Sequence, residues 1–409
     1  GPPLAMSYRP KFPAWLLRPS TAAAGFCAGL ILLGWMGRRV AAEGWHRDFV
    51  RFHPMVSPEA QYEPTVAEMS AIVRTACRPD QILVVVGGNS IFLGVGQVPD
   101  EVWTKRLQAD LGDRYAVVNL AFRGASPSDG GAVVAEALRK EFPRQIYIAN
   151  MAPFQSADPL GIDTYRFILL DAYYKGLLLP LPKRDREIGY YSRTLNYLDF
   201  PEMEKQAGAR IDSWLYFKNL WTWYSYTHHF TFAVPLMPHG PGAYEPRGSF
   251  PDAEIDFRSI PFERRFSPDT MRADLRIATD YTAKCYRRLP GGTWVLNKFL
   301  YNLFVKDWRN LFPDSLKGRT LLAVSRNSPL YTRQLSKEIL ARDEDAIAGT
   351  ESALKALGYD CIDYGRDFSD DDFGDRTHLT STGGDKLADL VAPEVQALAA
   401  RLGYTGRKQ

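Results

Sequence analysis

Five short apolar runs, separated by segments with helical features, constrain the fold of this chain more than any other feature. The runs are rich in β-branched residues, as in QILVVVG at 81–87, and are typical of strands buried on both faces. Strands that alternate with helices form a mostly parallel sheet with helices on both faces. We therefore predict an α/β fold, a doubly wound five-stranded parallel sheet. The strands are expected at 81–87, 115–121, 144–150, 319–325 and 359–364.

Helical segments lie before, between and after these strands. Ser126 and Pro127 form a good N-cap and N1 pair, which predicts a helix that ends near Phe142. The charged run RQLSKEILARDED (333–345) is expected to form a solvated helix face. The predicted helices cover 64–76, 99–111, 126–142, 332–357 and 381–402.

The alternation stops between the third and fourth strands, which indicates a large aromatic-rich insertion over 155–316. Dense Trp and Tyr suit a membrane interface, a sugar-binding surface or a partner protein, and a helical subdomain would bury the same residues in its own core. We expect this insertion to determine substrate choice. Its densest aromatic runs are 164–182, 213–232 and 294–308, and polar residues interrupt each run, so none is expected to span a membrane.

An uncharged stretch covers 19–37, between Arg18 and the pair Arg38-Arg39. At a rise of about 1.5 Å per residue, a helix of this length nearly covers a hydrocarbon core of about 30 Å. We predict an uncleaved membrane anchor. The mean hydropathy of −0.25 excludes a chain made mostly of membrane spans but leaves room for one.

Two alternatives compete with the anchor. A cleaved signal peptide would use the basic residues before position 19 and a cleavage site at Val40-Ala41-Ala42, but Arg38-Arg39 would then lie where signal peptides are usually uncharged. A buried core helix would normally show a polar face, which this stretch lacks. Basic residues on both sides give no orientation.

Composition narrows the possible ligands. The net charge of +3 gives no reason to expect nucleic-acid binding. The absence of CxxC pairs argues against structural zinc. Of the four cysteines, Cys27 lies inside the anchor, and the other three allow at most one disulfide and a free thiol: Cys77, Cys285 and Cys361. His228, His229 and His239 lack metal-ligand spacing, so neither a metal nor a cofactor is expected.

Polar residues stand where the predicted strands end, the place where open α/β sheets bind ligands. Gly88-Asn89-Ser90 follows the first strand, Gly124 follows the second, and Asn150 ends the third. Asp375-Arg-Thr-His378 follows the fifth. A serine hydroxyl needs a base to become a nucleophile, and an imidazole held by a carboxylate three residues earlier can act as that base. We expect Ser90 as nucleophile, His378 as base and Asp375 as its partner.

This ordered set resembles the SGNH (GDSL-like) hydrolase superfamily over about 81–155 and 317–402. The resemblance implies an SGNH/flavodoxin-like fold and an oxyanion hole made by the amides of Ser90 and Gly124 and the side-chain NH₂ of Asn150. The usual Gly-Asp-Ser is Gly88-Asn89-Ser90 here, and Asn150 lacks the usual Gly-x-Asn-Asp setting. Without the family, Ser90 could cap the next helix, and Gly124 and Asn150 could be turn residues.

The predicted organisation follows from these assignments. Residues 1–18 form a tail in which 1–7 resemble a tag remnant, 19–37 the transmembrane anchor, and 38–80 a connector. Residues 81–409 form an SGNH-like catalytic domain that carries the insertion 155–316.

The expected chemistry is acyl transfer through Ser90, with either water or another hydroxyl as acceptor. Membrane-tethered SGNH proteins of this layout resemble the partners of membrane-bound O-acyltransferases, of the DltD type in teichoic-acid D-alanylation and the AlgJ/AlgX type in alginate acetylation. The resemblance implies an O-acyltransferase (acetyl or D-alanyl type) in the cytoplasmic membrane, with its domain facing the periplasm or cell exterior, acting on a polysaccharide or teichoic-acid-like polymer. The alternatives are a periplasmic carbohydrate esterase and a non-catalytic component of an envelope polymer secretion complex.

Overall fold

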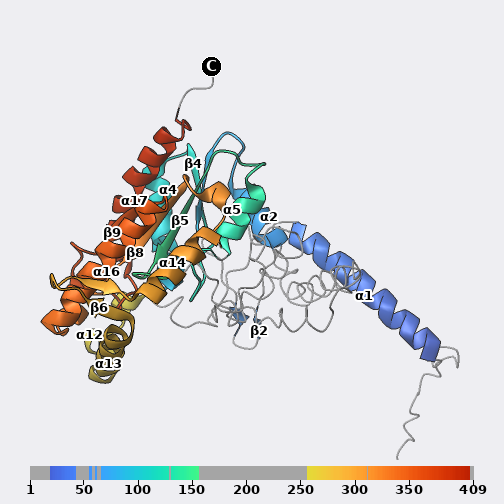
Figure 1. Ribbon diagram of the computed structural model, residues 1–409. Helices are drawn as coiled ribbons and strands as arrows, with labels where there is room; N and C mark the ends of the chain where they lie inside the picture. The colour runs from blue at the N-terminus through green and yellow to red at the C-terminus, as the bar shows by residue number, and fades with distance from the viewer. Residues whose placement is uncertain are drawn as a thin grey trace, which may run out of the picture.

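A five-stranded sheet with parallel neighbours throughout forms the centre of the molecule (Figure 1). The computed structural model describes residues 19–42, 55–57, 60–61, 66–128, 130–155, 256–310 and 312–405. The sheet order is β4-β3-β5-β8-β9, and the α/β prediction is confirmed. Its strands are β3 (Ile82–Val86), β4 (Tyr115–Asn119), β5 (Gln145–Met151), β8 (Thr320–Ser325) and β9 (Asp360–Tyr364).

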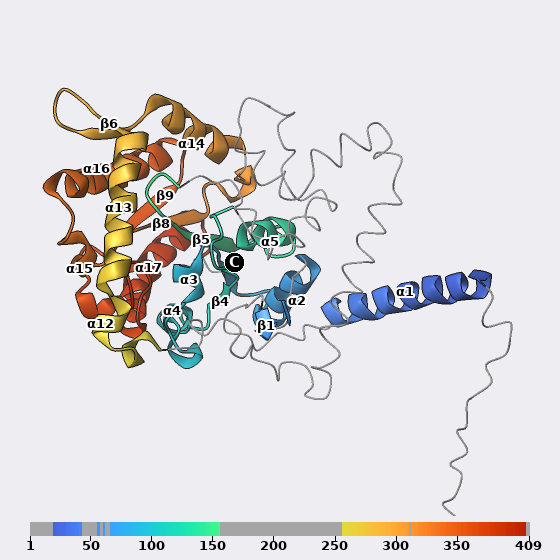
Figure 2. The same cartoon turned by 90° about the horizontal axis from the view of Figure 1, so that it is seen from below.

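Helices cover both faces of this sheet, as the two views in Figures 1 and 2 show. Successive residues of β3 alternate between two cores, with Leu83 and Val85 in one and Ile82, Val84 and Val86 in the other. The first core contains residues of α2 (Val66–Ala76), α5 (Gly131–Leu138), α14 (Lys298–Asn310) and α16 (Lys337–Ala356). The second contains residues of α3 (Ser90–Leu93), α4 (Trp103–Leu111) and α17 (Ser381–Arg401).

The strand order creates a switch point between β3 and β5. The chain passes from β3 to β4 through α4 on one face, then returns to β5 through α5 on the other face. Connections that leave neighbouring strands on opposite faces open a crevice at their carboxyl ends. Val86, the last residue of β3, lies beside Ile148 of β5, so the residues that follow β3 lie beside the last residues of β5, among them Asn150.

The helix predicted over 126–142 is shorter in the structure, where α5 ends at Leu138, and the prediction is wrong at its beginning. Ser126 does not cap it, because its hydroxyl pairs with that of Ser128 at 3.0 Å, and α5 begins only at Gly131. The Pro127 carbonyl instead accepts a 2.6 Å hydrogen bond from the buried Tyr147 hydroxyl. This bond holds 126–128 over β5 as a turn.

Two other predicted helices begin later than expected. The helix expected over 332–357 begins at Lys337 as α16, and only Thr332 belongs to the preceding turn, α15 (Pro329–Thr332). Ser328 caps α15 and Ser336 caps α16. The segment 99–111 begins as a 3₁₀ turn, η2 (Pro99–Glu101), and continues as α4. Each break gives the chain a fresh N-cap or turn to change direction, which the periodicity of the sequence did not reveal.

The N-terminal helix α1 (Pro19–Ala42) runs away from the sheet and its helices in both views (Figures 1 and 2). Its span Pro19–Met36 is the only stretch in the described part of the chain that is long and apolar enough to cross a membrane. The Phe26, Ile31 and Trp35 side chains are exposed, and only 6% of the span is buried, so the core-helix alternative is wrong. That this helix is an uncleaved anchor, and the side of the membrane on which the rest of the chain lies, stay predictions.

Only the second part of the predicted insertion falls within the described residues. It contains η5 (Phe257–Ser259), α12 (Phe262–Arg265), α13 (Pro268–Cys285), the hairpin β6 (Tyr286–Arg288) and β7 (Trp294–Leu296), α14, and η6 (Asp314–Leu316). The aromatic run 294–308 falls in β7 and α14, where Phe304 and Trp308 are buried in the core. The runs 164–182 and 213–232 lie outside the described residues. A short hairpin, β1 (Met55–Ser57) and β2 (Ala60–Gln61), lies in the connector.

Close packing after β3 requires a glycine at position 87. A Cβ added to Gly87 would overlap the Tyr147 hydroxyl. Gly131 of α5 packs against the same place, because a Cβ added to Gly131 would lie 3.0 Å from the Cα of Gly87. The Gly87 amide donates to Ile148 at 2.7 Å, so its backbone cannot move away without losing this bond. The turn that leads to Ser90 is therefore built directly on buried β5.

We predict that Gly87→Ala lowers the free energy of unfolding by about 1–3 kcal/mol, because the added methyl group overpacks a closed core. Gly318→Ala is the control, because nothing lies within 4 Å of its Cβ position. Its effect should stay within about 0.5 kcal/mol. Denaturant unfolding of both variants measures the difference, and equal effects would contradict the described packing.

Candidate active site

Ser90 is the first residue of the one-turn helix α3, at the carboxyl end of β3. Gly88 turns the chain with a φ of +91°, and a Cβ there would overlap the Asn150 side chain, so this position requires glycine. Asn89 is the N-cap, and its side-chain oxygen accepts from the Ile91 amide at 3.0 Å. The alternative in which Ser90 caps this helix is therefore wrong. A sharp strand-to-helix turn of this kind exposes a serine hydroxyl at the edge of a sheet.

Ser90, His378 and Asp375 form one hydrogen-bonded chain, although 288 residues separate the first two. The Ser90 Oγ lies 2.8 Å from His378 Nε2, and His378 Nδ1 lies 2.7 Å from Asp375 Oδ2. A carboxylate at Nδ1 accepts a hydrogen, which leaves Nε2 free to accept the serine proton. The structure thus brings together the three residues that the sequence analysis selected.

The Asp375 carboxylate is anchored by backbone donors as well as by the imidazole. Its Oδ1 accepts from the amides of His378 and Thr377 at 2.7 and 2.8 Å. Burial alone would raise the pKa of this carboxyl, but the hydrogen bonds from His378 and Thr377 hold the pKa below its usual value. Asp375 therefore stays ionised at neutral pH and fixes the imidazole tautomer.

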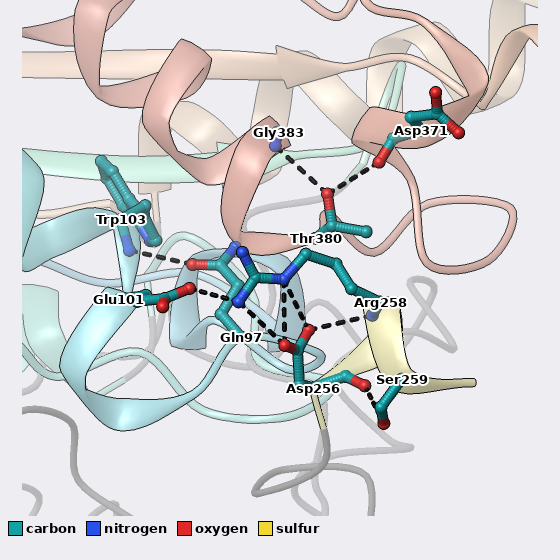
Figure 3. A network of polar contacts seen from close by, with 9 residues as sticks. All are labelled: Gln97, Glu101, Trp103, Asp256, Arg258, Ser259, Asp371, Thr380 and Gly383. Carbon is teal, nitrogen blue, oxygen red and sulfur yellow. Dashed lines mark hydrogen bonds and ion pairs between the residues drawn. The ribbon is translucent and has the colours of Figure 1, made fainter.

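The loop that carries Asp375 and His378 is closed by its own backbone. Phe373 and Leu379 form a β-bridge, and the Gly374 amide donates to the His378 carbonyl at 2.8 Å. Immediately after it, Thr380 caps α17: its hydroxyl accepts from the Gly383 amide and donates to the Asp371 carbonyl at 2.9 Å (Figure 3). His378 therefore stands on a short, bonded loop at the beginning of a long helix.

Two predicted oxyanion donors line the same cavity as the serine hydroxyl. Gly124 has a φ of +69°, a conformation that favours glycine, and it borders the cavity with Ser90. Within the described residues, no acceptor takes the amide hydrogen of either Ser90 or Gly124. Their predicted role in an oxyanion hole stays a prediction.

The third predicted donor, Asn150, lies beneath the turn and is not among the residues that line the cavity. It is fully buried, its Oδ1 accepts from the Asn89 amide at 2.9 Å, and its Nδ2 donates to Asn89 Oδ1 at 2.7 Å. This paired contact holds the turn before Ser90. A role for Asn150 in an oxyanion hole stays a prediction and would use its second amide hydrogen.

A cavity of about 680 Å³ extends from Ser90 across the carboxyl end of β8. Ser90 and Gly124 border one part, and residues of α13, α15 and α16 border another. Tyr286 and Tyr331 supply aromatic surface. Four arginines and three carboxylates also line the cavity: Arg326, Arg342, Arg366, Arg376, Asp274, Asp343 and Glu344.

Most of the charged run 333–345 is exposed, as the sequence predicts, but Arg342 and Asp343 depart from the expected solvated face. The Arg342 side chain is buried and lies 5.0 Å from the centre of the Tyr286 ring. Burial raises the pKa of the neighbouring Asp343, although Arg342 opposes this shift. The prediction was wrong for Arg342 and Asp343 alone, because α13 and the β6–β7 hairpin, which begins at Tyr286, pack against this side of α16.

The arginines of the cavity are held by carboxylates. Arg326 pairs with Asp363 at 2.6 Å and with Glu344 at 2.5 Å. Burial opposes its charge, but the two carboxylates raise its pKa further above the ordinary value. Arg376, which lies between Asp375 and His378, pairs with Asp274 of α13 at 3.3 Å, and its guanidinium lies 5.5 Å from the centre of the Tyr331 ring. The sequence gives no sign that these arginines and carboxylates line a cavity, because charged residues usually lie on the surface.

The described residues contain neither a metal-binding cluster of side chains nor a disulfide. No group of three or more His, Cys, Asp or Glu side chains there could hold a metal, and His228, His229 and His239 lie outside this part. The four cysteines, all within it, are free thiols. Burial raises the pKa of the Cys77 thiol to about 11 and that of Cys361 to about 12, so neither is a reactive thiolate at neutral pH.

Comparisons with models of protein families, with curated proteins and with solved structures find no match to this chain. The geometry of its residues therefore has to carry the functional argument.

The lowered pKa of Asp375 predicts a pH-dependent contribution to stability. A carboxyl whose pKa is lower in the folded chain contributes stability above its unfolded pKa of about 3.9, and this contribution disappears as the pH falls through the folded value. The wild type should therefore unfold at higher denaturant than Asp375→Asn at pH 7, and the gap should narrow as the pH falls below about 4. Asp269→Asn, an exposed change on α13, should match the wild type throughout. A gap that is constant with pH would contradict this assignment.

Proposed function

We propose that this chain is a serine-dependent acyl-transfer enzyme of the SGNH (GDSL-like) type, held at a membrane by α1. The observation that carries the proposal is the hydrogen-bonded chain from Ser90 through His378 to Asp375. Its position at the switch point of a sheet with the flavodoxin-like order supports the same class. In this proposal 81–409 form one catalytic domain, of which 155–316 are an insertion.

In the first half of the proposed reaction, the Ser90 Oγ attacks the acyl carbonyl of the donor, and its proton passes to His378 Nε2. The carbonyl oxygen becomes an oxyanion that accepts from the amides of Ser90 and Gly124, with the second Asn150 amide hydrogen as the predicted third donor. Each such donor contributes about 3–4 kcal/mol of transition-state stabilisation. The intermediate then collapses, the leaving group takes the proton from His378, and Ser90 carries the acyl group.

In the second half, an acceptor hydroxyl gives its proton to His378 Nε2 and attacks the acyl carbon. The bond to Ser90 breaks, and the serine recovers its proton from the imidazole. Asp375 stays ionised throughout and stabilises the imidazolium that forms in each half. Water as acceptor gives an esterase, and a sugar or polyol hydroxyl gives a transferase.

Two features favour a transferase that acts on a cell-envelope polymer. The helix α1 would keep the site near substrates that emerge at a membrane, and the cavity reaches well beyond Ser90, with two tyrosines and several paired charges on its walls. Aromatic faces and planar polar groups suit a polysaccharide or teichoic-acid-like acceptor. We propose an acetyl or D-alanyl donor delivered by a membrane-bound O-acyltransferase partner, with the domain in the periplasm or at the cell exterior.

The test is chemical analysis of envelope polymers from cells that carry wild type or Ser90→Ala. We expect acyl groups on the polymer to fall to background in the variant, because loss of a serine nucleophile typically costs on the order of 10⁶ in rate. Ser336→Ala is the matched control, since it removes a helix cap at an exposed serine, at a cost of about 1 kcal/mol, and leaves the nucleophile intact.

The other outcomes contradict the proposal in distinct ways. A gain of acyl groups in Ser90→Ala would identify a carbohydrate esterase. No change would favour a non-catalytic component of a secretion complex.

A further inference from the structure

The ring of Phe257 packs edge-on against the imidazole of His378. The two ring centroids are 6.3 Å apart and the planes meet at 87°. Phe257 is 7% exposed, and it is the second described residue after 156–255. Ser90 and Asp375 hold the two nitrogens of the imidazole, whereas Phe257 contacts the ring without a hydrogen bond.

Two glycines make room for the Phe257 ring. A Cβ added to Gly96 or to Gly374 would overlap this ring, and Gly96 has a φ of +90°. The Phe257 amide also donates to the Gly96 carbonyl at 3.0 Å. Gly374 belongs to the loop between Phe373 and Leu379 that presents Asp375 and His378. The Phe257 ring thus lies between the loop after α3 and the loop of the general base.

An ion-pair clasp fixes the backbone on both sides of Phe257. Asp256 accepts from the Arg258 amide at 2.9 Å, the Arg258 guanidinium pairs with Asp256 and with Glu101 of η2, and the Ser259 hydroxyl donates to the Asp256 carbonyl at 2.6 Å (Figure 3). The Arg258 and Glu101 side chains are 41% and 49% exposed. Exposed ion pairs contribute only about 0–1 kcal/mol to the free energy of unfolding. This clasp therefore affects the position of Phe257 more than the stability of the fold.

The position of a general base matters more than its contact energy. A displacement of about 1 Å at a catalytic group costs on the order of 100-fold in rate. Catalytic side chains are held by neighbours that lock their rotamers. Phe257 is well placed for this purpose, because its ring and the Asp375 carboxylate restrict the imidazole from different sides.

We infer that Phe257 is a positioning residue for His378, and that the Arg258–Glu101 clasp holds it in place. The segment that follows 156–255 thereby helps to set the geometry of the general base. As far as reactivity is concerned, this inference rests on the proposed function. The contact itself does not depend on the reaction and can be tested without it.

The first test measures the rate at which a fluorophosphonate probe labels Ser90 in the full chain. We expect Phe257→Ala to label about 10–100-fold more slowly than wild type, and Phe257→Leu to recover part of the rate. Phe142→Ala is the matched control, because Phe142 is also 7% exposed but lies in the other core, before β5. Labelling of the folded Phe142→Ala protein should proceed at the wild-type rate. Equal slowing in both alanine variants would reduce Phe257 to a packing role and overturn the inference.

The clasp has its own matched pair of variants. Arg258→Gln should slow labelling about 3–10-fold, because Phe257 loses its tether to η2. Arg272→Gln removes an exposed ion pair to Asp269 on α13 and should have no effect on the rate. Equal rates in Arg258→Gln and wild type would overturn the role of the clasp.

A second measurement separates failure of this inference from failure of the proposed function. The His378 Nδ1 proton, bonded to Asp375 at 2.7 Å, should give a downfield proton resonance in the full chain, which His378→Gln removes. We expect this resonance to shift or broaden in Phe257→Ala and to remain in Phe142→Ala. An unchanged resonance in Phe257→Ala overturns the inference whether or not Ser90 reacts. If the resonance responds while wild-type Ser90 is unlabelled, the proposed function fails and the positioning contact stands.

Discussion

The site depends on the reversal of winding direction between β3 and β5. The chain leaves β3 toward α4 on one face of the sheet and leaves β5 toward Phe154 on the other, so the two carboxyl ends open to a common crevice. Gly87 and Gly88 allow the turn after β3 to lie directly on Tyr147 and Asn150 of the neighbouring strand. The turn ends at Ser90, which meets a histidine that the last loop brings to the same edge.

Charges in the cavity are largely paired with one another. Arg326 is held between Asp363 and Glu344, and Arg376 is held by Asp274. A cavity of this kind differs from a simple anion site, because most of its cationic groups already have carboxylate partners. In the proposed function, the tyrosine faces and planar polar groups of these walls would contact the hydroxyl-rich part of the acceptor. The pair between Arg376 and Asp274 also connects α13 with the loop that carries His378.

Much of this arrangement could be predicted from the sequence. Apolar β-branched runs identified all five sheet strands to within about two residues, since a strand buried on both faces leaves a clear pattern. Ser90, Asp375 and His378 were found because each follows a predicted strand, and carboxyl ends of parallel strands share one edge. Local rules were enough for these features.

Features that depend on distant neighbours could not be predicted in this way. Arg342 lies in a charged run that is otherwise mostly exposed, and the run itself does not reveal that α13 and the β6–β7 hairpin pack beside this residue. Ser126 and Pro127 are typical of the beginning of a helix, but the Tyr147 hydroxyl donates to the Pro127 carbonyl and the helix begins later, at Gly131. Phe257 carries no signal of its own, because its importance comes from two glycines and a histidine that are far away in the sequence.

The most direct test of the central claim is peptide mass spectrometry of the full chain after brief exposure to p-nitrophenyl acetate and an acid quench. We expect an acetyl group on Ser90 in the wild type, a slower appearance of this group in Asp375→Asn, and no acetyl group at this position in Ser90→Ala. An adduct confined to other residues, or the same rate in Asp375→Asn as in wild type, would contradict this claim.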